Sequence, residues 1–380
     1  MNVVVRQIIA TEQANSSPRK VVLIASKDFQ HGEEIYKEHP VIAQLDIDLE
    51  GTAQYCSHCF RALQSGKSIT PPEDLLGSAY CSTECQMISD TQSQNLLFGR
   101  GPLVPNEAVT GQLERTEAAE AERRAYQQAF VDFLKACGWT QVLLVGRFCA
   151  RHVSEEVKKL APLPASLVER SALPEPITPS PEYTFYDHVE RLKFLEIQPT
   201  EMVMLEHNLL QDVLKKAVAG LEEVVEINKY LAMKGRIAYN SIGVAFDGGR
   251  DDRADPKGRV ETWEWSRTPV GTERQIGSAL YRVSSYLTHS CSPSVRLCFK
   301  GTNELHLIAN RAISKGEHLT MSYTSIEAKN GEAPEVARRQ RRIRLARGWR
   351  FACECEACTG KKSEVVGTMT APDVILEKGV

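Results

Sequence analysis

The sequence predicts an α+β protein in which a β domain of short strands is interrupted by inserted modules. Short apolar runs typical of strands occur near both ends of the chain, whereas the middle carries the three- and four-residue apolar spacing of amphipathic helices. Eight of the eleven cysteines also fall into two tight groups. We therefore expect strands, a first metal site, helices, further strands and a second metal site, in that order.

Composition limits the class of protein before any motif is considered. The chain has 380 residues, of which 42% are hydrophobic and 25% charged, enough for two or three globular modules. The net charge of -3 gives no overall field that would attract nucleic acid or an anionic membrane. No apolar run approaches the roughly 20 residues of a membrane helix, and the amino-terminal MNVVVRQIIATEQ lacks the pattern of a secretory signal. We therefore expect a protein of the nucleus and/or cytoplasm, with no membrane partner and no direct sequence-specific binding of nucleic acid.

The first two segments are predicted from their local patterns. Residues 1–50 are expected to begin the β domain, with a buried strand at VVLIA (21–25), a turn at 28–32, and an extended piece at EIYKEHPVIA (34–43). Pro40 in that piece indicates the edge of a sheet, because proline cannot donate to a ladder. Residues 51–95 then form a loop-rich module around the first cysteine group.

The middle segment, residues 96–235, is expected to be helical. One apolar stripe recurs at three and four residues and contains Tyr126, Phe130, Phe133, Leu134 and Cys137. Two further helices are expected within residues 203–232. Six prolines between residues 162 and 181 indicate a connector.

β patterning returns in residues 236–325. NSIGVAF (240–246), VRLCFK (295–300), LHLIANRAI (305–313) and HLTMSYT (318–324) are predicted strands, and residues 248–259 are a polar surface loop. Residues 326–360 hold a basic helix and the second cysteine group, and residues 361–380 are expected to be a flexible tail. The basic helix has a partial apolar face predicted from Val336, Ile343 and Leu345.

The cysteine spacing predicts two structural zinc sites, because four thiolates satisfy a tetrahedral zinc and a reducing compartment disfavours disulfides. The first site is expected to use Cys56, Cys59, Cys81 and Cys85. His58 is an alternative ligand there, although a solvent-facing histidine is the simpler interpretation. The second site has three thiolates in CECEAC, and Cys291 is the best fourth ligand because the Pro293 turn holds its sulfur away from a strand. Its ligands are thus predicted to be Cys291, Cys353, Cys355 and Cys358, leaving Cys137, Cys149 and Cys298 as core thiols.

The residues around the second group resemble the SET domain. SYLTHSCSPS (285–294), ISKGEHLTMSY (313–323) and WRFACECEAC (349–358) are similar, in order, to that family's NHSCxPN, GEELTxxY and CxCxxC post-SET sequences. SKDFQHGEEIYKEHPVIA (26–43) resembles the start of a SET domain, and AYNSIGVAF (238–246) its NSF segment. A cysteine module after the first strands is typical of the SET-and-MYND (SMYD) proteins, including the yeast Set-type relatives. The resemblance covers residues 1–95 and 236–360, and implies a SET-type β fold with an inserted zinc module, a helical insertion and a zinc-bound post-SET tail.

The resemblance implies an S-adenosylmethionine-dependent protein-lysine methyltransferase acting on a histone, ribosomal or other protein. Tyr323 would be the channel tyrosine that orients the lysine nitrogen and the cofactor methyl group. Phe351 would stack against the adenine, and Arg19 or Lys20 would contact the cofactor carboxylate. The remaining cofactor contacts would come from Asn240, Thr288 and His289, the last largely through its backbone.

Several departures from the family pattern support an alternative function. No glycine lies between Pro18 and Leu23, where the family has a glycine-rich first strand. Thr288 and Ser294 replace asparagines, and the zinc module is a reduced MYND-like unit with one cysteine group. The alternative is a catalytically silent SET scaffold that binds protein partners through this module and the arginine-rich helix. Seven arginines between residues 338 and 350 form either a solvated helix or a docking patch for acidic or nucleic-acid-bound substrates.

Overall fold

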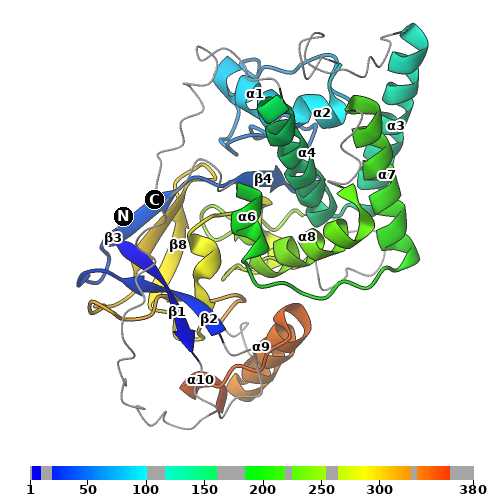
Figure 1. The fold of residues 1–380 in the computed structure, drawn as a ribbon. Helices are drawn as coiled ribbons and strands as arrows, with labels where there is room; N and C mark the ends of the chain where they lie inside the picture. The colour runs from blue at the N-terminus through cyan, green and yellow to red at the C-terminus, as the bar shows by residue number, and fades with distance from the viewer. Residues whose placement is uncertain are drawn as a thin grey trace.

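The computed structural model describes residues 2–9, 19–100, 116–160, 185–218, 225–253, 264–326 and 332–359. Its helices α3, α4, α7 and α8 gather on one side and its strands on the other (Figure 1). The predicted proline-rich connector, the carboxy-terminal tail and part of the 248–259 loop lie outside the described residues. Within the described residues, no helix has the length and apolar character that crossing a membrane requires.

In the part of the chain that the structure describes, ten short strands form four small sheets. The strands are β1 (Val3–Ile9), β2 (Arg19–Ala25), β3 (Glu34–Glu38), β4 (Ile42–Leu45), β5 (Ile242–Val244), β6 (Gly277–Leu280), β7 (Thr288–His289), β8 (Val295–Phe299), β9 (Leu305–Ala309) and β10 (Thr320–Met321). β1 and β2 form an antiparallel hairpin, while β3-β9-β8 and β4-β6-β5 form antiparallel three-stranded sheets. β10 pairs with β7 in parallel.

The two ends of the chain therefore build one β domain. β3 pairs with β9 and β4 pairs with β6, although more than 200 residues separate the members of each pair. β9 lies in the centre of its sheet and is buried along its whole length, which agrees with the apolar run LHLIA. The prediction of an interrupted α+β fold is confirmed.

The inserted segment is helical. Its helices are α1 (Thr83–Ser89), the π-helix η1 (Asp90–Gln94), α2 (Asn95–Phe98), α3 (Glu117–Cys137), α4 (Thr140–Leu160), α6 (Phe185–Glu190), α7 (Glu201–Ala217) and α8 (Ile227–Asn240). Thr116 caps α3 through its hydroxyl, which accepts from the Ala119 N–H at 3.1 Å, and Gly138 ends the helix at φ +68°. Phe130, Leu134 and Cys137 of the predicted stripe are buried, whereas Tyr126 and Phe133 are half-buried.

α8 connects the helical insertion to the site. It ends at Asn240, and β5 begins two residues later, so the position of the helix sets the position of that asparagine. Gly235 lets the helix approach residue 195 closely, because a Cβ there would lie 2.0 Å from the Leu195 carbonyl oxygen. The insertion also contacts the β domain directly, because α4 packs against β4 and β6.

The carboxy-terminal segment contains α9 (Pro334–Trp349) and α10 (Glu356–Thr359). The predicted apolar face of α9 was wrong for two residues, because Val336 is 46% exposed and Ile343 is 39% exposed. At about 100° per residue, these two point away from the buried side of the helix. That side instead carries Ala337, Leu345 and Trp349.

Candidate functional site

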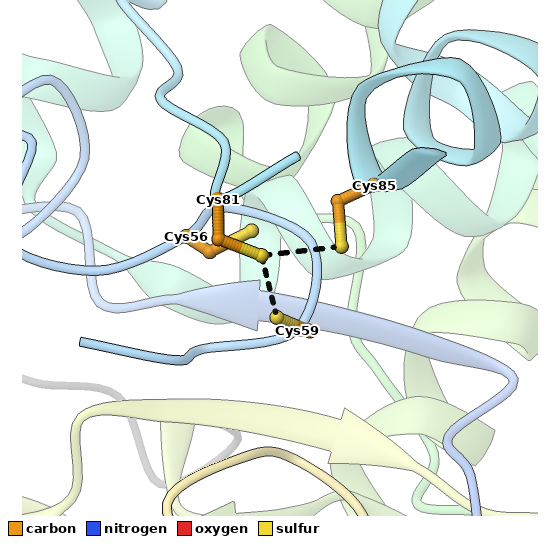
Figure 2. A group of neighbouring side chains, drawn as sticks. All are labelled: Cys56, Cys59, Cys81 and Cys85. Carbon is orange, nitrogen blue, oxygen red and sulfur yellow. Dashed lines mark hydrogen bonds between the residues drawn. The ribbon is translucent and has the colours of Figure 1, made fainter. Parts of the chain in front are cut away.

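The first cysteine group is a compact cluster (Figure 2). The sulfurs of Cys56, Cys59, Cys81 and Cys85 all lie within 4.8 Å of one another. The Cys81 sulfur is 3.6 Å from that of Cys59 and 3.6 Å from that of Cys85. A tetrahedral zinc with bonds of about 2.3 Å requires sulfurs about 3.8 Å apart, so the four side chains fit this metal.

Local structure positions these four thiols. Cys81 precedes α1 and Cys85 lies in its first turn, where Ser82 caps the helix by accepting from the Cys85 N–H at 3.2 Å. Hydrogen bonds from Cys59 and Cys85 lower the pKa of the Cys56 thiol, which favours the thiolate form that binds metal. The His58 ring is half-buried and lies outside the cluster.

The second cysteine group joins the β domain to the tail. The Cys291 sulfur lies 3.9 Å from that of Cys353 and 3.4 Å from that of Cys358. With Cys355, these sulfurs also lie within 4.8 Å of one another. A hydrogen bond from Cys291 lowers the pKa of Cys353 to about 3. The cluster fits a second four-thiolate zinc, which would leave no open position for a substrate.

Tyr323 lies at the centre of an aromatic group next to this cluster. It is 3% exposed, and its hydroxyl donates to the Leu287 carbonyl at 2.7 Å. Burial raises the pKa of Tyr323, so the hydroxyl stays protonated at neutral pH and acts as a donor. Its ring centroid is 5.4 Å from that of Trp349 and 6.2 Å from that of Phe351.

His289 connects Tyr323 to the second cluster. Its Nδ1 accepts from the Tyr323 backbone N–H at 3.1 Å, and its Nε2 lies 3.2 Å from the Cys291 sulfur. The neutral ring that accepts at Nδ1 carries its proton on Nε2 and therefore donates to that sulfur. Both ring nitrogens are thus used within the protein, so the His289 side chain has no free nitrogen for another ligand. The centroid of its ring lies 5.7 Å from that of the Phe351 ring, and the two rings are tilted by 49°.

The other predicted cofactor residues lie in different environments. Asn240 is buried, and its amide nitrogen donates to the carbonyls of Lys193 and Arg236, both at 2.7 Å. Both amide hydrogens are therefore used within the protein. Thr288 is half-buried in β7, beside Thr320 of β10. Arg19 and Lys20 begin β2, but their side chains lie outside the described part of the chain.

Sequence reasoning missed Arg267, which lies against Tyr323. Its guanidinium carbon is 4.4 Å from the centre of the Tyr323 ring, and the side chain is 1% exposed. It also missed Trp349, whose indole N–H donates to the Tyr239 carbonyl at 3.2 Å. The surrounding WSRTPVGTER gives no local signal for a buried arginine. A cavity of about 220 Å³ opens next to these side chains and is lined by residues that include Trp265, Ser266, Thr268, Tyr323 and Trp349.

Comparisons with known proteins agree with this arrangement. The SET domain family model matches residues 20–324. A SET and MYND domain-containing protein of Dictyostelium discoideum is 19% identical over 348 residues, which cover 90% of this chain and 81% of that protein.

Shorter matches involve named methyltransferases. Histone-lysine N-methyltransferase SET5 of Candida glabrata is 33% identical over 84 residues, covering 22% of this chain and 15% of that protein. N-lysine methyltransferase SMYD2-B of Danio rerio is 31% identical over 91 residues, covering 24% of this chain and 19% of that protein. The chain therefore spans less than a quarter of the length of these two relatives. The family match nevertheless covers most of this chain, and the chain belongs to the SET domain family.

Proposed function

We propose that the protein transfers methyl groups from S-adenosylmethionine to lysines of a histone, ribosomal or other protein. The observation that carries the proposal is the arrangement of Tyr323, His289 and Phe351 around one buried site, held by the second cysteine cluster. The names of the relatives, which include histone-lysine and N-lysine methyltransferases, support the same reaction.

The residues of the site suit methyl transfer to an amine. S-adenosylmethionine, when bound, supplies a methyl group on a cationic sulfur, and an uncharged lysine amine can attack the methyl carbon and displace that sulfur. An amine has a pKa of about 10.4 in water, so a buried site that disfavours charge helps it to lose its proton. The protonated Tyr323 hydroxyl and the Leu287 carbonyl form a fixed polar pair that would orient the reacting atoms. Orientation of this kind can supply several kcal/mol of the barrier reduction.

The proposed cofactor contacts lie along β7 and the tail. Phe351 is half-buried and comes two residues before Cys353, so the metal cluster would hold its ring in place for stacking on the adenine. The backbone of Thr288 and His289, and the side chains of Arg19 or Lys20, are proposed to complete the site. We also propose two structural zinc ions and a nuclear and/or cytoplasmic location, where eight such thiols stay reduced.

Hydrogen exchange locates this site without knowledge of the substrate. We expect S-adenosylmethionine to slow backbone exchange in residues 287–291 and 349–353 of the zinc-loaded protein. S-adenosylhomocysteine should give the same pattern, whereas ATP, which shares only the adenosine part, should not. Unchanged exchange in both segments at millimolar S-adenosylmethionine would contradict the proposed cofactor site.

The alternative is a catalytically silent scaffold that binds protein partners through the first zinc module and α9. One observation favours it: the amide hydrogens of Asn240 are already donated to protein carbonyls. Exposed arginines of α9, such as Arg339 and Arg342, would then contact acidic partners. The hydrogen-exchange experiment separates the two functions, because a scaffold needs no S-adenosylmethionine.

A further inference from the structure

A short segment at residues 266–268 lies across the proposed active site as an added strand. The Arg267 N–H donates to the Ser241 carbonyl at 2.8 Å, and the Gly243 N–H donates to the Arg267 carbonyl at 3.1 Å, which gives a parallel bridge to β5. On the other side, the Thr268 N–H donates to the Tyr323 carbonyl at 3.1 Å. Backbone bonds to the flanking segments are how proteins hold an extended peptide by strand addition.

The segment inserts one basic side chain into the site. The Arg267 guanidinium lies 4.4 Å from the centre of the Tyr323 ring and 5.0 Å from that of Tyr239. It donates to the carbonyls of Tyr239 at 2.7 Å and Leu287 at 3.4 Å. The Leu287 carbonyl is the same oxygen that accepts from the Tyr323 hydroxyl. The guanidinium therefore lies where the proposed reaction places the amine of the target lysine.

The surroundings of this cation are unusual for a structural arginine. Its remaining bonds go to the Ser285 carbonyl at 3.0 Å and to Oδ1 of Asn240 at 2.7 Å, so all its hydrogen-bond partners among the described residues are neutral. A buried cation without a carboxylate is costly, and proteins normally pair it. Carbonyl oxygens and the faces of two tyrosine rings instead form a receptor for a basic side chain.

The segment is also anchored beyond the site. The Ser266 hydroxyl lies 2.7 Å from the Ser278 hydroxyl. The Gln141 side-chain amide donates to the Ser266 hydroxyl at 3.2 Å. Glu264, two residues earlier, accepts from the Gln141 N–H at 3.0 Å. The segment is thus a fixed occupant of the site in this structure.

We propose that residues 264–268 are an intrachain pseudosubstrate that fills the peptide site and places Arg267 where the target lysine would bind. This inference rests on the proposed function. A guanidinium keeps its charge at every physiological pH, so Arg267 can occupy the site without acting as a nucleophile. An external substrate must present its lysine on an extended segment and displace residues 264–268. The resting protein is therefore slow on external lysines.

The test exchanges the arginine for a residue that can react. In Arg267→Lys, the introduced amine loses a proton to solvent, its nitrogen bonds to the methyl carbon, and the carbon–sulfur bond breaks to release S-adenosylhomocysteine. We expect methylation at position 267, mapped by mass spectrometry of peptides, at a rate independent of protein concentration because it occurs within one chain. Arg147→Lys makes the same change at another buried arginine and should stay unmethylated.

A second variant removes the occupant. Arg267→Met keeps much of the side-chain volume but has no donor, and it should methylate a mixture of core histones and ribosomal proteins faster than the wild type. If the segment occupies the site about 99% of the time, its release raises the apparent affinity for a substrate about 100-fold.

The outcomes distinguish the two proposals. If the folded Arg267→Lys protein binds S-adenosylmethionine but its introduced lysine gains no methyl group, the pseudosubstrate is wrong and the proposed function stands. An Arg267→Met protein no faster than wild type likewise overturns the pseudosubstrate. If neither the wild type nor the variants bind S-adenosylmethionine, both proposals fail.

Discussion

Removal of the Cys291 thiol should detach the tail from the β domain. Cys291 is the one member of the second cluster that lies outside the tail, 62 residues before Cys353. Zinc would hold these thiolates only in the folded protein, so its binding free energy adds to the stability of this site, on the order of 10 kcal/mol in small zinc domains. Cys291→Ser is expected to lose a large part of this stabilisation. The loss of stability should be confined to the tail after α9, because Leu345 and Trp349 of α9 are buried and need no contact with the cluster to stay so.

Two measurements test this expectation. Metal analysis by mass spectrometry should find about two zinc ions per wild-type chain and about one in Cys291→Ser, because three thiolates hold the second zinc far less tightly. Hydrogen exchange should accelerate in residues 350–359. Cys298→Ser makes the same substitution at a nearby half-buried cysteine outside both clusters, and it should retain two zinc ions. Two zinc ions in Cys291→Ser, with unchanged exchange in the tail, would refute the proposed pairing.

Two further perturbations probe the fold. Burial raises the pKa of Glu264 to about 8, against an ordinary value of 4.5. Between these two pH values the carboxyl is ionised in the unfolded chain and protonated in the folded protein, so the free energy of unfolding falls as the pH rises from about 4.5 to about 8. Glu264→Gln, which cannot ionise, should flatten that fall in denaturant unfolding measured at several pH values, and parallel curves for the two proteins would contradict the assignment. Phe130→Ala should cost about 3–5 kcal/mol of unfolding free energy, because the ring is fully buried and stacks on Phe98 at 6.2 Å. A loss below about 1 kcal/mol would show that this contact between α2 and α3 contributes little.

The parts of the fold that the sequence predicts depend on local patterns. The stripe of α3 is visible because its apolar residues recur within one helix, and the strand at residues 21–25 is a continuous apolar run. The cysteine groups are visible because metal ligation requires close spacing. The link from Cys291 to the tail spans a much longer interval, and it was predicted from the ligand count and the neighbouring proline rather than from periodicity.

The parts that the sequence does not predict depend on contacts between distant segments. Arg267 lies in a polar stretch of sequence. Its side chain is buried by Tyr239, Leu287 and Tyr323, which are at least 20 residues away along the chain and which the fold brings close to it. Asn240 resembles a cofactor residue in sequence, but the carbonyls that accept from its amide belong to residues 193 and 236. The buried side of α9 is also set by its partners, since Gly348 packs on the Trp265 ring.

Calorimetric titration with S-adenosylmethionine tests the central claim most directly. The zinc-loaded wild-type protein should bind it with micromolar affinity, and Phe351→Ala should weaken that binding because the adenine would lose its stacking partner. Phe299→Ala, at another half-buried phenylalanine of the β domain, should leave the affinity unchanged. No heat of binding at millimolar S-adenosylmethionine, or equal affinities in the two variants, would contradict the proposed methyltransferase site.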